Sequence, residues 1–272
     1  MDQQHIFEYT PTGVLYTTKE EAFRAKKHKM LLEYKRNGLL SQSNPIQTFE
    51  CKPRNGWFRS NEPEEHLDKI ASKLRNRLSP GEVNVGMFSY KDQTLADRLK
   101  QKHDIREHYA YGVEQDASAL IWPEDSSSED AADRIRTNIQ DVDIFIMRHY
   151  LEHYEKPELI IKAILSVLKK EAVIYIEIPD CSEFIKRKNP LFMWEQHKNF
   201  FTEGSFYELI KSMGIQCTLS TYGDSIEPSI CCLLEAHGRQ PTDECFGDRI
   251  KKPVDWIDKR YWARYIEAWQ EY

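Results

Sequence analysis

The sequence predicts an α/β fold with a mostly parallel sheet, and three observations support this prediction. Between residues 79 and 237, short apolar runs suited to strands alternate with segments of helical periodicity. Val142–Met147 is a continuous apolar run between polar residues, which is typical of a strand buried on both faces of a parallel sheet. The alternation ends in two strand-like runs joined by a turn at Gly223–Pro228, which predicts an antiparallel strand near the sheet's edge.

Each predicted element has a local reason. Pro157 suits the first turn of a helix, Thr202 is a candidate N-cap, and Gly214 is a candidate C-cap. The polar run Pro123–Asp133 is either an exposed loop or a frayed helix start. The predicted strands are Glu82–Met87, Tyr109–Glu114, Val142–Met147, Ala172–Ile178, Ile215–Tyr222 and Ser229–Ala236, and the predicted helices are Lys19–Arg36, Pro63–Leu78, Thr94–Lys102, Glu155–Lys170 and Glu203–Met213.

The chain divides into three predicted parts. Residues 1–78 form a small, mainly helical N-terminal lobe, residues 79–237 form the α/β domain, and residues 238–272 form a C-terminal aromatic helical tail. The tail carries aromatic residues at spacings compatible with an amphipathic helix. It is therefore expected to dock onto the core or onto another subunit, and a homodimer through the tail is the expected assembly.

Composition excludes several classes of partner. The net charge of −6 is spread among interspersed acidic and basic residues, so nucleic acid is not an expected partner. No segment approaches the length of a membrane span, and the N-terminus lacks an apolar stretch, so a cytoplasmic protein is expected. The six cysteines show no CxxC pair and no metal-ligand spacing with histidine; buried free thiols and no metal site are predicted.

The first two strands end in candidate nucleotide-binding residues. Gly86 begins a run, ending at Gln93, that holds a single glycine, so a surface loop and a cofactor loop explain it about equally well. Glu114 ends the second strand, where a carboxylate accepts hydrogen bonds from ribose hydroxyls. Acidic residues are also common at strand ends for structural reasons. The separation of Gly86 and Glu114 by one helix strengthens the nucleotide-binding interpretation.

The later strands are followed by residues that are candidates for contact with a cofactor or substrate, or for catalysis. Arg148, His149 and His153 follow Val142–Met147, although Glu152 and His153 equally suit a helix cap. Asp180 follows the next strand and is either a site residue or a turn residue. His197, two positions after Glu195, is the natural general base, and its alternative is a packed, hydrogen-bonded histidine.

These motifs resemble a known family. The segments MRHYLEHYEKPELIIKAILSVLKKEAVIYIEIPD at 147–180 and HKNFFTEGSFYELIKSMGI at 197–215 look like class I S-adenosylmethionine-dependent methyltransferases. They are most similar to the branch that acts on nucleotide-linked keto-sugars. The resemblance covers about 79–237 and implies a Rossmann-like fold with a mostly parallel seven-stranded sheet and a C-terminal antiparallel strand.

The resemblance also implies roles for individual residues. The family's acidic residue at the position of Glu114 binds the ribose of S-adenosylmethionine, the loop from Gly86 to Gln93, with Asp92, holds the amino-acid part of the cofactor, and the pair Glu195 and His197 belongs to the catalytic region. From their position after Val142–Met147, Arg148 and His149 are added as predicted cofactor contacts and His153 as a predicted catalytic residue. The chain departs from the family where Gln93 replaces the second glycine of the loop, because a side chain there crowds the backbone's approach to the cofactor. The family's N-terminal zinc-binding cysteines are unmatched, since only Cys51 precedes Cys181.

Methyl transfer to a small, carbohydrate-related or nucleotide-linked acceptor is therefore the leading hypothesis. The alternative is a non-catalytic binding or scaffold subunit that keeps the fold but has lost the cofactor loop. A third hypothesis is a different nucleotide-like ligand, since a fold alone does not determine function.

Overall fold

The computed structural model describes residues 7–9, 14–16, 32–35, 38–42, 45, 64–79, 81–89, 92–112, 126–187, 197–222 and 229–235. The predicted C-terminal tail, Glu114 and Glu195 lie outside these residues.

A six-stranded sheet forms the centre of the described structure, in the order β10-β11-β8-β7-β5-β6. Strands β5, β6, β7 and β8 are mutually parallel, whereas β11 is antiparallel to both of its neighbours. This confirms the mostly parallel α/β fold with a C-terminal antiparallel strand. The described residues supply six strands to this sheet, whereas seven were expected. The bounds are β5 Glu82–Ser89, β6 Asp104–Tyr111, β7 Val142–Arg148, β8 Leu168–Pro179, β10 Gln216–Tyr222 and β11 Ser229–Glu235.

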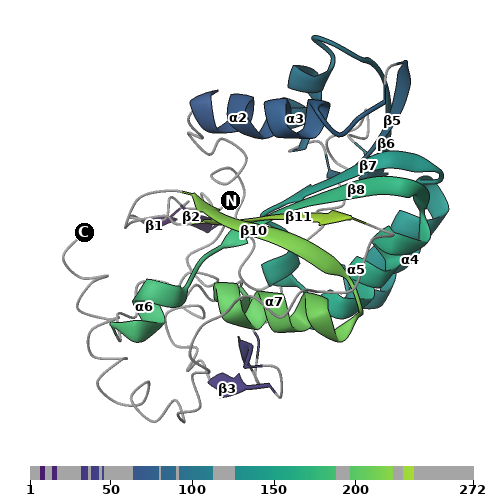
Figure 1. The fold of residues 1–272 in the computed structure, drawn as a ribbon. Coiled ribbons are helices and arrows are strands. Elements are labelled where there is room, and N and C mark those ends of the chain that lie inside the picture. Colours follow the sequence, from purple (N-terminus) through teal and green to yellow (C-terminus); the bar gives the residue numbers. More distant parts are fainter. Residues whose placement is uncertain are drawn as a thin grey trace, which may run out of the picture.

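Helices cover both faces of the sheet (Figure 1). Helices α2 (Glu64–Arg75) and α3 (Gln93–Leu99) pack together on one face. Helices α4 (Ser128–Asn138), α5 (Pro157–Ser166) and α7 (Glu203–Ser212) lie on the other. The short helices η6 (Leu151–His153) and α6 (Ser182–Lys186) follow β7 and β8. The result is a three-layer sandwich whose strands end toward η6 and α6.

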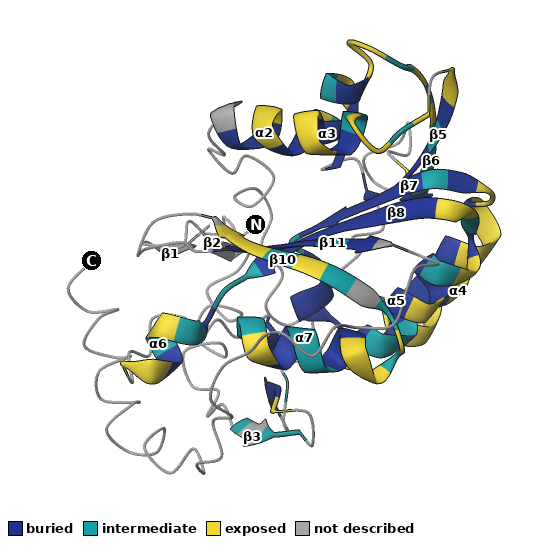
Figure 2. Ribbon diagram, in the orientation of Figure 1, coloured by how far each residue is buried: buried dark blue, intermediate teal, exposed yellow. Residues whose placement is uncertain are grey.

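The central strands are buried on both faces, as their apolar sequences require (Figure 2). Alternate side chains of β7 point to opposite layers: Ile144 and Ile146 pack with α2 and α3, whereas Phe145 and Met147 pack with α4, α5 and α7. Ile70, Ala71 and Leu74 of α2 belong to the first of these two cores. Helix α2, which sequence analysis assigned to the N-terminal lobe, therefore shares a core with the sheet.

A second, smaller sheet joins distant segments of the chain. Strands β3 (Leu32–Tyr34), β4 (Leu40–Gln42) and β9 (Asn199–Phe200) pair antiparallel in that order. The prediction that the Lys19–Arg36 helix includes residues 32–34 is therefore wrong, because these residues pair as a strand instead. A separate two-stranded sheet contains β1 (Phe7–Tyr9) and β2 (Val14–Tyr16).

Several predicted elements are confirmed with shifted ends. Helix α7 begins after Thr202, whose side chain accepts a hydrogen bond from the Ser205 N–H, and Gly214 follows it with φ +72°. The helix predicted over 155–170 ends at Ser166, and β8 already begins at Leu168. The polar run 123–133 contains a true helix start, capped by Ser127 at the head of α4.

Two further observations concern the helices and the cysteines. No helix in the described part of the chain is long and apolar enough to cross a membrane. The four cysteines within the described residues are free thiols, and Cys181, Cys231 and Cys232 are buried.

Candidate functional site

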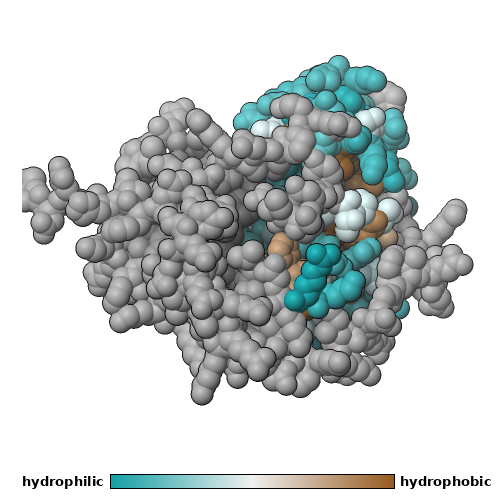
Figure 3. Space-filling view, turned by 90° about the vertical axis from the view of Figure 1, so that its left-hand side faces the viewer, coloured by the Kyte–Doolittle hydropathy of each residue, from teal (hydrophilic) through white to brown (hydrophobic). Residues whose placement is uncertain are grey.

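Polar side chains are buried where the parallel strands end, at the edge where open α/β sheets bind ligands. Figure 3 views the molecule from the side on which β8 leads toward α6, with hydrophilic side chains gathered at the level of α2 and α3. Beneath the surface, two groups of charged and polar residues lie next to each other. One follows β7 and the other joins β7 and β8 to α2.

The first group, here named the carboxylate–histidine cluster, consists of Glu152, His153 and His197. Their exposed fractions are 1%, 4% and 5%, respectively. The rings of His153 and His197 meet edge to face with centroids 4.9 Å apart, and His153 Nε2 lies 4.0 Å from Glu152 Oε1. The folded chain thus brings together two residues, His153 and His197, that were predicted separately as catalytic.

Backbone hydrogen bonds hold the two parts of this cluster together. The Lys198 N–H donates to the Glu152 carbonyl at 2.9 Å, and the His153 N–H donates to the Tyr150 carbonyl at 3.0 Å. From the small sheet, the Gln42 side-chain amide donates to the His197 carbonyl at 2.6 Å. The position of His197 is therefore fixed by both η6 and β4.

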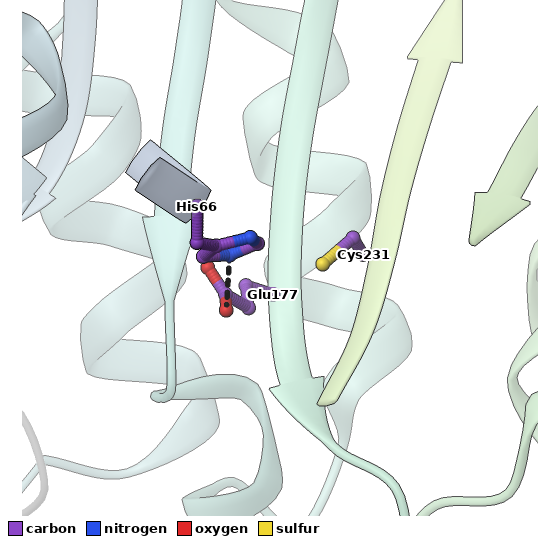
Figure 4. A group of neighbouring side chains, drawn as sticks. All are labelled: His66, Glu177 and Cys231. Carbon is purple, nitrogen blue, oxygen red and sulfur yellow. Dashed lines mark hydrogen bonds and ion pairs between the residues drawn. The ribbon is translucent and has the colours of Figure 1, made fainter. Parts of the chain in front are cut away.

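The second group, here named the Arg148–Glu177 network, lies on the α2 side of the sheet. Arg148 Nε donates to Glu177 Oε2 at 2.9 Å, and the Tyr175 hydroxyl donates to the same oxygen at 3.1 Å. His66, at the start of α2, places Nε2 3.1 Å from Glu177 Oε1. Figure 4 shows His66 and Glu177 facing each other, with the thiol of Cys231 beside them on β11.

The electrostatics of the network favour an ionised Glu177. Burial alone would raise the pKa of this carboxyl, but hydrogen bonds from His149 and His66 and the charge of Arg148 outweigh burial and hold the pKa well below its usual range. Burial, together with the Glu177 charge, raises the pKa of the Cys231 thiol to about 12. Glu177 is thus a buried anion neutralised by Arg148, and Cys231 stays protonated at neutral pH.

His149 lies between the two groups. Its backbone has φ +56°, a left-handed conformation that is uncommon for a residue with a side chain. Its N–H donates to the Glu177 carbonyl at 2.7 Å, and its ring nitrogens lie 3.7 Å from Glu177 and 4.0 Å from Glu152. Such strained residues concentrate at functional sites, where surrounding contacts maintain them.

The end of β5 differs from the expected cofactor loop. Gly86 lies inside β5, three residues before its end, and a Cβ there would meet Phe145 Cδ2 at 2.9 Å. Close packing thus accounts for this glycine without a ligand. The buried Asp92 carboxylate accepts hydrogen bonds from the N–H groups of Phe88 and Ser89, both at 3.1 Å, so these donors are directed at the protein's own carboxylate.

Aromatic side chains fill the space beside this loop. Phe88 is fully buried, and its ring lies 5.2, 5.0 and 5.8 Å from the ring centroids of Tyr111, Tyr150 and Tyr154. The Ser89 and Tyr150 hydroxyls are hydrogen-bonded at 2.6 Å. The aromatic packing therefore occupies the junction of the ends of β5, β6 and β7.

The structure places the predicted site residues in different surroundings. His153 and His197 form one cluster, while Arg148 belongs to the neighbouring network and His149 links the two. Asp180 accepts hydrogen bonds from the Ser182 N–H and hydroxyl, which supports its interpretation as a turn residue.

Sequence analysis missed three residues of the Arg148–Glu177 network, His66, Tyr175 and Glu177. His66 gives no local signal because its partner comes from a distant strand. Glu177 lies in the otherwise apolar run Ala172–Ile178, and that interruption of the apolar pattern was the available signal.

Comparisons with known proteins yield distant structural matches. No protein-family profile matches the sequence, and no curated protein matches it. The solved plantazolicin methyltransferase aligns over 66% of this chain and 88% of its own, at 11% identity and TM-score 0.45.

Two further structural matches are similarly distant. The 1,6-didemethyltoxoflavin-N1-methyltransferase of Burkholderia thailandensis, solved with S-adenosylhomocysteine, aligns over 75% of this chain and 98% of its own, at 12% identity and TM-score 0.43. A chain from Nostoc punctiforme aligns over 63% of this chain but only 56% of its own length, at 15% identity and TM-score 0.42.

Proposed function

We propose that the protein transfers the methyl group of S-adenosylmethionine to a small acceptor. The observation that carries this proposal is the buried carboxylate–histidine cluster, which lies just beyond β7 at the ligand-binding edge of a mostly parallel sheet. The resemblance of 147–180 and 197–215 to nucleotide-sugar C-methyltransferases supports it. The finer proposal is a carbohydrate-related or nucleotide-linked acceptor, handled by a cytoplasmic protein that dimerises through its tail.

The residues of the cluster would position the acceptor and take its proton. S-adenosylmethionine, when bound, supplies an already activated methyl group, so positioning provides much of the rate acceleration. His197 is the candidate general base, because an imidazole near neutral pKa accepts a proton from a hydroxyl, amine or acidic carbon. The Glu152 carboxylate, 4.0 Å from His153, would stabilise positive charge that forms on that imidazole. The fixed backbone of His197 favours a single orientation of the acceptor.

The residues after β7 and those at the end of β5 differ in how well they suit a bound cofactor. The polar cluster after β7 suits an acceptor and a reacting methyl group. At the end of β5, the N–H groups of Phe88 and Ser89 already bind Asp92, and the Phe88 ring is packed among tyrosines. Any cofactor contact by the predicted Gly86 or Asp92 would require these groups to rearrange.

This packing favours a second candidate function, a non-catalytic methyltransferase-like binding or scaffold subunit. In that case the chain retains the sheet and its edge, while Phe88 takes space that a nucleoside would need. The two candidates differ in a simple property, because only the enzyme must bind S-adenosylmethionine and its product.

Calorimetry with S-adenosylmethionine and S-adenosylhomocysteine tests the proposal. Binding of either nucleoside supports the enzyme, and absence of binding of both at millimolar concentration would refute it. A Phe88→Ala variant separates the alternatives further. If Phe88 blocks the nucleoside, this variant gains affinity over the wild type, whereas in a working enzyme the wild type binds and the variant gains nothing.

Substitution of His197 tests the catalytic assignment. If His197 is the base, His197→Ala lowers turnover by about 10²–10⁴-fold while nucleoside affinity stays nearly intact. If His197 only packs, the variant loses about 1–3 kcal/mol of folding free energy and activity falls with the folded fraction. Melting temperature, affinity and turnover measured on one preparation distinguish these outcomes.

A further inference from the structure

The carboxylate–histidine cluster has the composition of a metal site as well as of an acid–base site. We propose that Glu152, His153 and His197 bind one divalent transition-metal cation of the zinc class. This inference goes beyond the proposed function, because metal binding is measured without any methyl donor or acceptor. It also differs from the prediction made from cysteine spacing, which gave no metal site.

The geometry brings one ligand atom from each residue close to a common point. An imidazole nitrogen from each histidine and a carboxylate oxygen of Glu152 all lie within 4.8 Å of one another. Three atoms at such separations share a point no more than about 2.8 Å from each, whereas zinc bonds to nitrogen and oxygen are about 2.0–2.2 Å. Side-chain movements of less than about 1 Å therefore complete the coordination.

The donor set selects the class of metal. Two imidazoles and one carboxylate suit zinc and other late first-row cations, whereas calcium and magnesium prefer sites made entirely of oxygen ligands. Three protein ligands leave a fourth tetrahedral position open, which is the arrangement of reactive rather than structural zinc sites. The site would thus hold a cation that can also bind a water molecule or an acceptor oxygen.

The ligands are held in place before a cation arrives. Glu152 and His153 are adjacent in η6, and the Glu152 carbonyl accepts the hydrogen bond of Lys198, the residue that follows His197. The side-chain amide of Gln42 donates a hydrogen bond to the His197 carbonyl. Because this backbone is already ordered, little conformational entropy remains to be lost on binding.

The charge around Glu152 also suits a cation. Imidazoles of His149 and His153 lie next to the buried Glu152 carboxylate, each at 4.0 Å. Neutral imidazoles are metal ligands, and a cation held by Glu152, His153 and His197 would neutralise the carboxylate. The nearby guanidinium of Arg148 is directed at Glu177 instead.

A comparison with the neighbouring network explains the choice of site. His66, Glu177 and Cys231 also form a compact, buried trio of ligand types (Figure 4). There, however, the Arg148 guanidinium lies 2.9 Å from Glu177 and would repel a cation. The Arg148 guanidinium already neutralises Glu177 in this trio. We therefore expect no metal ion to bind there, and variants of His66 and Cys231 serve as controls.

Metal binding changes the role of His197. A histidine that ligates a metal offers its lone pair to the cation and is no longer a free base for the acceptor. A bound cation would instead polarise an acceptor oxygen at the open position. The two roles of His197 are therefore mutually exclusive in one molecule, and metal binding decides between them.

The test is a titration of the tag-free, EDTA-treated full chain with Co²⁺, followed by visible absorption, and with Zn²⁺ in competition. One equivalent of Co²⁺ should bind, and Zn²⁺ should displace it. Glu152→Gln, His153→Asn and His197→Asn should each weaken binding by about tenfold or more. The control variants His66→Asn and Cys231→Ser should bind as the wild type does.

A second probe does not depend on variants that fold. Pulsed electron paramagnetic resonance of the wild type with one equivalent of Cu²⁺ should detect two coordinated imidazoles. Circular dichroism of each variant identifies any that lose structure.

The proposal is overturned if Co²⁺ and Zn²⁺ do not bind at millimolar concentration, if folded variants of the three ligands bind normally, or if the control variants abolish binding. Calorimetry with S-adenosylhomocysteine on the same samples keeps this result separate from the proposed methyl transfer. Metal binding without nucleoside binding supports the cation site alone, and the reverse supports methyl transfer alone.

Discussion

Gly86 was predicted to bind a cofactor, but close packing in the core accounts for a glycine at this position. Its α-carbon faces Phe145, Ile139 and Val142, with a hypothetical Cβ at 2.9, 3.2 and 3.3 Å from their nearest atoms. Gly86→Ala should therefore overpack the core and cost about 1–3 kcal/mol of folding free energy. Urea denaturation measures this loss. A variant as stable as the wild type would show that the core yields easily at this point.

Glu177 predicts a specific dependence of stability on pH. Its pKa is lowered in the folded protein, so the carboxylate contributes stability that is full above its unfolded pKa of about 4.3 and is lost as the pH falls from there through the folded value. Glu177→Gln should cost about 3–5 kcal/mol at pH 7, because Arg148 is left as a buried, uncompensated charge.

The measurement is urea denaturation of both proteins from pH 7 downward. The difference in unfolding free energy between wild type and Glu177→Gln should stay constant above about pH 5 and shrink below it. A difference that stays constant down to the lowest pH at which both proteins fold would contradict the assignment.

At the scale of elements, α7 has a complete N-terminal cap. Thr202 accepts a hydrogen bond from the Ser205 N–H at 3.1 Å, and the Thr202 N–H donates to the Ser205 hydroxyl at 3.0 Å. Thr202→Ala should cost about 1 kcal/mol. Thr202→Ser, which keeps the hydroxyl, is the matched control in thermal denaturation. Equal losses in both variants would place the contribution in the methyl group rather than in the cap.

Periodicity predicted most helices and strands correctly, because a buried strand or an amphipathic helix carries its own apolar pattern. It failed where pairing determines the structure. Leu168–Lys170 continued a helical pattern, but Val142 pairs with Leu168 and starts β8 there. Likewise, Leu32–Tyr34 became a strand because it pairs with β4. The partner of Leu168 lies in β7, distant in sequence, so the local pattern contains no record of it. Strand β4 follows β3 closely, but it is itself paired with the distant β9, and the local pattern does not record that pairing either.

The candidate site was predictable to a similar degree. His153 and His197 were found from their positions after strands and from the resemblance, but their contact depends on how η6 and β9 meet. Glu152 appeared only as a possible cap, and its burial beside two imidazoles is a property of the fold. Glu114 and Glu195 lie outside the described residues, so their assigned roles stay predictions.

At the scale of the whole molecule, the N-terminal third contributes to both the core and the site. Residues Leu67, Ile70 and Leu74 of α2 are 4%, 6% and 0% exposed, and His66 of the same helix contacts Glu177. Strand β4 supplies the buried Gln42 beside His197. The predicted division at residue 78 therefore separates elements that share buried contacts.

A chain that begins at residue 79 should consequently fail to fold. Burial of Leu67, Ile70 and Leu74 contributes about 1.5–3 kcal/mol each, and their sum is comparable to the whole stability of a typical domain, about 5–15 kcal/mol. Loss of His66 also removes one partner of a buried carboxylate.

A chain that begins at residue 31 is the matched control, since it keeps β3, β4 and α2 and lacks the separate β1–β2 pair. Circular dichroism and size-exclusion chromatography should find the shorter chain unfolded or aggregated and the control folded. A folded chain from residue 79 with a cooperative thermal transition would instead establish the α/β domain as a unit that folds without the N-terminal lobe, and it would require the sheet to tolerate the loss of α2 from one face.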